Sequence, residues 1–174
     1  MKRYLLVGVA VLAAACGSSS PSSPSAQPTT VVFTAAMTAS QETPPITNAD
    51  QNAKGNATIT FHLTRDGSGA ITAATVDFVY SLSGFPAGTP IILTHIHEGG
   101  PNVPGGVKVN SGLTAATAIT LADGSTSNIT FNNCTYPDGL PLIQKIIDNP
   151  NGYYFNVHSQ LNPGGAVRAQ LVRQ

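Results

Sequence analysis

The sequence predicts an all-β domain, a two-sheet sandwich or a Greek-key barrel, with one short helix near residues 140–148. Short runs rich in Val, Ile, Thr, Phe and Tyr alternate apolar and polar residues with the period of two that a half-buried strand requires. Clusters of Gly, Pro, Asn, Asp and Ser separate these runs at intervals typical of sandwiches and barrels. One later segment has the spacing of a helix instead.

The runs with the strand pattern are residues 31–39, 55–64, 70–82, 90–97, 106–113, 117–122, 127–133, 152–159 and 166–173. Between the second and third runs, the letters RDGSG predict a tight hairpin turn, because Asp-Gly accepts the positive φ angles of such turns. In the preceding connection, SQETPP reads as a loop or exposed edge. We expect Glu42 and Asp50 on the solvated surface, since no spacing fixes the distance between them.

The helix is predicted from DGLPLIQKIIDNP. Pro141 suits the first turn of a helix, and Pro150 prevents its continuation. The apolar residues between them fall on one stripe: Leu142, Ile143, Ile146 and Ile147. We expect this short helix to lie across an end or edge of the β-structure.

The N-terminal segment has the features of an export signal. Residues 1–15 carry two basic residues, a short apolar run and then small residues, a pattern typical of a signal peptide and too short for a membrane span. The order LAAAC resembles the bacterial lipobox, which implies cleavage before Cys16 and lipidation of its thiol. Residues 16–30, rich in Ser and Pro, are expected to form a solvated tether. The expectation is therefore a domain at residues 31–174, membrane-anchored in a bacterial cell envelope.

Composition excludes some classes of function. The formal net charge is +0 at pH 7 and charged residues make up 9% of the chain, so the clustered Lys and Arg of a nucleic-acid-binding protein are missing. There is no Ser-His-Asp order with a nucleophile elbow, no activated cysteine and no nucleotide loop, which favours a non-enzymatic role. If Cys16 carries lipid, Cys134 has no partner in the chain and is expected to be a buried, small hydrophobic residue.

The residues best suited to chemistry are histidines. His95 and His97 alternate with Ile96 on a predicted strand, so both rings point the same way, and such a pair is a recurrent ligand pattern for copper or zinc. A third ligand is available from GYYFNVHS, where His158 and Asn156 share one face. A symmetric hairpin through NPGG would place Arg168 opposite Asn156.

Two features of these strands stay open at the level of sequence. Ile91 and Leu93 have the same parity as the two histidines, so their strand is expected to be buried on both sides or bulged before Thr94. In the later strand, Tyr153, Phe155 and Val157 are expected on the buried face and Tyr154, Asn156 and His158 on the other. His62 is expected to be an ordinary strand-face residue. The alternative to a metal site is that the three histidines form a polar network that holds loop ends to the sheet.

Three blocks carry a family resemblance: ASQETPPITNADQNAKGNATITF, LTHIHEGGPNVPGGVKVN and NPNGYYFNVHSQLNPGGAVRAQL. In this order they resemble the signature blocks of the CHRD domain, named after chordin, over about residues 31–171. The resemblance implies an immunoglobulin-like β-sandwich or barrel. In animals the domain occurs in an extracellular growth-factor antagonist, and the family implies no particular enzymatic activity for bacterial members.

A second, weaker resemblance concerns the layout of the histidines. A His-x-His strand, a later lone histidine and an arginine after a glycine turn are similar to the order in copper/zinc superoxide dismutases. This likeness implies His95, His97 and His158 as copper ligands and Arg168 as an anion guide. The chain departs from that pattern because it lacks a zinc-loop histidine cluster and a bracing cysteine pair.

Two functions follow as hypotheses from the sequence. The first is a lipid-anchored envelope protein whose CHRD-like domain is a binding or structural module that contacts a protein or glycan. The second is a copper- or zinc-binding protein with a dismutase-like site at His95, His97 and His158, in which Asn156 and Arg168 act as network or anion-binding residues.

Overall fold

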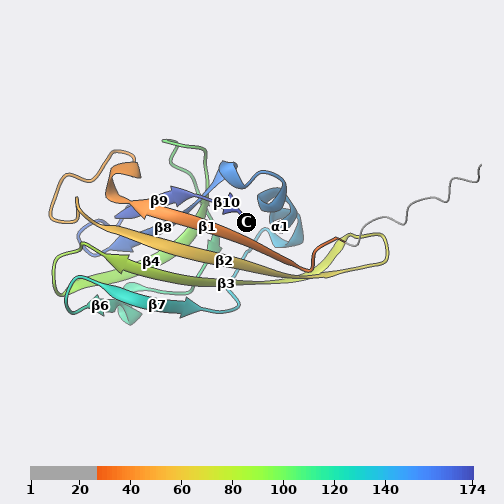
Figure 1. Cartoon of the computed structure of the whole chain (residues 1–174), viewed down its shortest axis with the longest axis horizontal. Helices are drawn as coiled ribbons and strands as arrows, with labels where there is room; N and C mark the ends of the chain where they lie inside the picture. Colours follow the sequence, from red (N-terminus) through yellow and green to blue (C-terminus); the bar gives the residue numbers. More distant parts are fainter. Residues whose placement is uncertain (1–26) are drawn as a thin grey trace, which may run out of the picture.

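A computed structural model describes residues 27–174 of the chain (Figure 1). The expected signal peptide at 1–15, Cys16 and the tether as far as residue 26 lie outside the described residues. In the part that is described, no helix is long and apolar enough to cross a membrane. The end of the expected tether already belongs to the fold, because Leu63 N donates to Thr29 O and Arg65 Nε donates to Pro28 O.

Residues 27–174 form antiparallel strands and one α-helix, and the all-β prediction is confirmed. The strands are β1 (Thr30–Thr38), β2 (Lys54–Arg65), β3 (Ile71–Ser83), β4 (Thr89–Glu98), β5 (Val107–Asn110), β6 (Ile119–Leu121), β7 (Thr126–Phe131), β8 (Tyr153–Ser159), β9 (Val167–Gln170) and β10 (Val172–Arg173). The helix α1 spans Gly139–Asp148. Each predicted run contains a strand, because alternation is a local signal that the sequence carries directly.

The strands form one continuous sheet in the order β5-β4-β8-β9-β1-β2-β3-β7, with β10 beside β1 and β6 beside β4. The sheet curls into a half-barrel, in which β1, β2 and β3 run side by side along the long axis (Figure 1). Within the described chain, β1 pairs with β9 at a single position, Thr38 with Arg168. This narrow junction divides the sheet into two limbs.

Aromatic residues join the inner faces of the two limbs. The ring of Phe155 on β8 lies 5.0 Å from that of Phe78 on β3 and 5.6 Å from that of Tyr80, both in edge-to-face geometry. Such pairs contribute about 0.5–1.5 kcal/mol each beyond the area that they bury. The free sulfhydryl of Cys134 is buried against the same core, as the sequence predicts. The hydrophobic core therefore occupies the concave side of the sheet.

The helix is confirmed, with its apolar stripe buried. The buried residues are Leu142, Ile143, Ile146 and Ile147, and α1 packs against β3 near one end of the molecule (Figure 1). The predicted hairpin between β2 and β3 also forms, although its positive φ angle falls at Gly69 and not within Asp-Gly. The Asp66 carboxylate stabilises the turn by accepting hydrogen bonds from Ser68 and Ala70.

One expectation about the loops is wrong: Glu42 and Asp50 are buried, with 6% and 0% of their surfaces exposed. The Asp50 carboxylate accepts hydrogen bonds from Ser159 Oγ at 2.5 Å and from Asn162 Nδ2 at 2.6 Å. These two donors to Asp50 lie more than a hundred residues further along the chain, so the local sequence gave no sign of them. The Asp50 carboxylate therefore helps to attach the first loop to the last hairpin.

Candidate metal centre

Strand alternation puts His95 and His97 on the face of β4 that is opposite the core. Ile96, between them, is fully buried in the core, so the flanking histidines point the other way. The register between β4 and β8 shifts between Ile91 and Leu93, and this bulge lets Ile91 reach the core despite its odd number. The bulge that the sequence offered as one alternative is therefore present.

The third histidine comes from β8, the neighbour of β4. The register pairs His97 with Tyr154, His95 with Asn156 and Leu93 with His158. Tyr153, Phe155 and Val157 belong to the hydrophobic core, as expected, and the other face of β8 is covered too, because every residue of β8 is buried. Loops cover this second face and give it a polar layer of its own.

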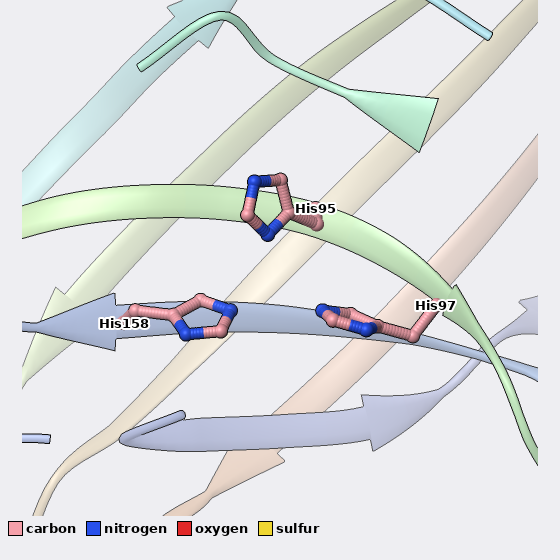
Figure 2. A group of neighbouring side chains, drawn as sticks. All are labelled: His95, His97 and His158. Atoms are coloured by element: carbon pink, nitrogen blue, oxygen red, sulfur yellow. The ribbon is translucent and has the colours of Figure 1, made fainter. Parts of the chain in front are cut away.

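The three imidazole rings converge within this layer. One candidate ligand nitrogen from each of His95, His97 and His158 lies within 4.8 Å of the other two. The ring centroids are 5.1 to 5.7 Å apart, and a nitrogen of each ring is turned toward the other rings (Figure 2). Bonds of about 2.0–2.1 Å to one ion would place the three nitrogens about 3.3–3.6 Å from one another, so binding would require the side chains to move inward.

Backbone carbonyls fix the tautomers of two rings. His97 Nδ1 lies 2.9 Å from Gly105 O, and His158 Nδ1 lies 2.9 Å from Pro163 O. A carbonyl oxygen only accepts, so each Nδ1 must carry the proton and each Nε2 must present its lone pair. An imidazole that donates its far N–H to a carbonyl is the usual arrangement of a metal-binding histidine.

The lone pairs have no partner inside the protein. His97 Nε2, His158 Nε2 and His95 Nδ1 are buried without a hydrogen bond. Burial lowers the pKa of His95 and of His158 to about 4, with a further contribution from neighbouring histidines, and it also lowers the pKa of His97. All three rings are therefore neutral at pH 7, which is the state that binds a metal ion. Each unpaired nitrogen costs about 1–3 kcal/mol, which a bound cation would offset.

A stack of side chains supports the ring of His97. Tyr154 lies parallel to it, with centroids 4.9 Å apart, and the Tyr154 hydroxyl accepts a hydrogen bond from Gly105 N. The guanidinium of Arg168 lies over the ring of Tyr154, with Cζ 4.3 Å from the ring centre. Arg168 also donates from Nε to Gln41 O and from Nη2 to Thr43 Oγ1.

The other residues singled out in the sequence fall into two groups. Asn156 and Arg168 pair directly across β8 and β9, as the symmetric hairpin predicts, and both belong to the buried polar layer. The hydrogen bonds of Arg168 tie it to the loop after β1, which supports its place as a network residue. His62 lies apart on β2, half exposed, and contacts Asp77 at 3.2 Å.

Sequence reasoning missed Glu42 as a member of this layer. Its carboxyl is buried, and burial raises the pKa of Glu42 to about 7, although the nearby Arg168 opposes the shift. Its Oε1 atom has no hydrogen-bond partner. The sequence feature that could have indicated a role for Glu42 is the position of SQETPP at the end of a strand, within the first of the three family-like blocks.

Fold and site together define a class of protein: a curled antiparallel β-domain with a buried three-histidine cluster that could hold a metal ion. A family model described as the CHRD domain matches residues 33–171, and the chain belongs to this family. Searches of curated proteins and of solved structures find no match. The likeness to superoxide dismutases stays a prediction.

Proposed function

We propose that this CHRD domain binds one copper or zinc ion through His95 Nδ1, His97 Nε2 and His158 Nε2. The observation that carries the proposal is the convergence of three buried, unpaired ring nitrogens, two of them on rings oriented by backbone carbonyls. A network that only held loop ends to the sheet would use both nitrogens of each ring, because an unpaired buried nitrogen is costly. Imidazole nitrogen suits both Cu and Zn, so titration must decide between them.

The test is a metal titration of the full chain after treatment with a chelator. We expect one copper or zinc ion per chain with sub-micromolar affinity, and a large loss of affinity on changing any one of the three histidines to Ala. His62→Ala is the matched control, since this fourth histidine lies outside the cluster. No binding by the intact chain would overturn the proposal and leave the binding or structural module, with a protein or glycan partner, as the function.

We also propose that the protein is held to a bacterial envelope membrane by lipid on Cys16. The motif LAAAC after a basic and apolar N-terminus supports this proposal. Several acyl chains on one residue give stable attachment where a single chain does not. Cys16→Ser should move the protein from the membrane fraction to the soluble fraction of the exported proteins. A variant that stays with the membrane would exclude lipidation as the anchor.

A further inference from the structure

Besides the three histidine nitrogens, three buried side-chain oxygen atoms of the described residues have no hydrogen bond. Among the described residues, the buried side-chain atoms without a hydrogen bond are three imidazole nitrogens, Glu42 Oε1, Asn156 Oδ1 and Asp50 Oδ1. A metal ion would satisfy the nitrogens only. Buried polar groups almost always have partners, so each remaining oxygen needs an explanation.

Asn156 occupies a central place in the cluster. It lies directly opposite His95 in the register between β8 and β4, and it shares a face of β8 with Tyr154 and His158. Only 2% of its surface is exposed. A carboxamide oxygen accepts hydrogen bonds and donates none, so the partner that Asn156 Oδ1 lacks must carry an N–H or O–H group.

Asn156 lies close to Gly165, which lines a surface hollow. A surface hollow lies between residues 42–48 and residues 161–165, with Glu42 and Gly165 in its lining. A Cβ on Gly165 would lie 2.8 Å from both carboxylate oxygens of Glu42 and 2.8 Å from Asn156 Nδ2. Gly165 therefore lies close to both Glu42 and Asn156, and a side chain at this position would collide with them.

We propose that the metal centre keeps an open coordination position for a small neutral ligand with an O–H group, such as water or hydrogen peroxide, and that Asn156 Oδ1 accepts its hydrogen bond. The inference rests on the proposed function. Three protein ligands with a fourth, exchangeable position are typical of reactive zinc sites, whereas structural zinc sites have four protein ligands. The unpaired Asn156 Oδ1, opposite His95, therefore places the centre with the reactive type.

The first test uses the copper(II)-loaded full chain. Electron-nuclear double resonance in H₂O and in D₂O should show exchangeable protons on a coordinated ligand, and added azide should displace that ligand and change the visible spectrum. Metal binding without exchangeable protons and without a response to azide would overturn the open position, as would direct coordination by Asn156. Failure to bind copper or zinc at all would instead overturn the proposed function.

The second test isolates the role of Asn156. Asn156→Leu removes the acceptor, so water is held less well while azide, which has no O–H group, loses nothing. In the copper-loaded variant the dissociation constant of azide should therefore fall roughly fivefold, the effect of about one hydrogen bond. Asn156→Asp keeps an acceptor oxygen and should not show this gain, and exposed Asn132→Ala is the matched control. An unchanged azide constant in a folded, copper-loaded Asn156→Leu protein would exclude the role of Asn156.

Discussion

The rings of His97 and Tyr154 lie parallel, with an angle of 2° between their planes. Both side chains also converge on one residue of the covering loop, because His97 Nδ1 donates to Gly105 O and Tyr154 Oη accepts from Gly105 N. Gly105 thus contacts both members of the stack, and its carbonyl fixes the tautomer of His97, a candidate metal ligand. The loop, the tyrosine and the histidine act together in presenting His97 Nε2.

Tyr154→Phe should lower metal affinity about tenfold, within the range measured for groups that orient metal ligands. The variant keeps the stacked ring and removes only the hydroxyl that holds Gly105. Competition with a chromophoric chelator would measure the change. Tyr136→Phe is the control, because its hydroxyl donates to Ala74 O and makes no contact with the histidines. Equal affinities for Tyr154→Phe and the parent protein would show that the hydroxyl does not position His97.

Metal binding should persist to lower pH than binding by exposed histidines. The pKa of His95 and that of His158 are about 4 in the folded protein, so protons compete weakly for these nitrogens until the pH approaches that value. Burial lowers the pKa of His97 as well, so affinity should fall less between about pH 7.5 and pH 5.5 than it would for ordinary imidazoles with a pKa of about 6.5. Isothermal titration across this range checks the expectation. A steep loss of affinity near pH 6.5 would contradict it.

Glu42→Gln should stabilise the metal-free protein near neutral pH. The pKa of Glu42 is 4.5 in a model compound and about 7 in the fold. Its contribution to stability is therefore present below pH 4.5 and is lost as the pH rises through 7, because a buried carboxyl must then ionise. Urea unfolding should show a gain on the order of 1–3 kcal/mol for Glu42→Gln above pH 7, after allowance for partial solvation. The difference from the parent should vanish near pH 4.5, and a difference that is constant with pH would rule out the titration of Glu42 as its cause.

Asp50→Ala should destabilise the protein by about 2–4 kcal/mol, because it leaves Ser159 Oγ and Asn162 Nδ2 without their buried acceptor. The same change should weaken metal binding, since these residues hold the turn whose Pro163 carbonyl orients His158. Urea unfolding and metal titration measure the two effects.

Asp123→Ala is the matched control for Asp50→Ala. The Asp123 carboxylate also accepts hydrogen bonds, from Ser125, but in an exposed turn, so its loss should cost less than about 1 kcal/mol. Asp50→Asn keeps one acceptor oxygen, so its loss of stability should lie between those of Asp50→Ala and Asp123→Ala. Similar effects of the changes at Asp50 and Asp123 would show that the buried network contributes nothing special.

The sequence predicts those features that depend on near neighbours in the chain. Alternation located the strands, the apolar stripe located α1, and the His-x-His spacing placed His95 and His97 on one face. The direct pairing of Asn156 with Arg168 followed from a symmetric hairpin. These predictions succeed because strand period, helix period and hairpin register are local geometric properties.

Features that depend on distant contacts were missed or misjudged. Nothing near Asp50 in the sequence indicates that Ser159 and Asn162 would bury it. The same is true of Glu42, which becomes buried because the loop after β1 attaches to Arg168 through Gln41 and Thr43. The covered face of β8 is a further example, since loops from separate parts of the chain provide the cover.

The order of these parts along the chain also sets when the centre can first exist during biogenesis. His95 and His97 precede His158 by some sixty residues, and the turn that orients His158 is held by Asp50 from the first third of the chain. A partly synthesised or partly translocated chain therefore offers only a two-histidine fragment, with the low affinity of an incomplete ligand set. If the centre binds metal, the cell compartment in which the last hairpin folds would be the one that supplies the ion.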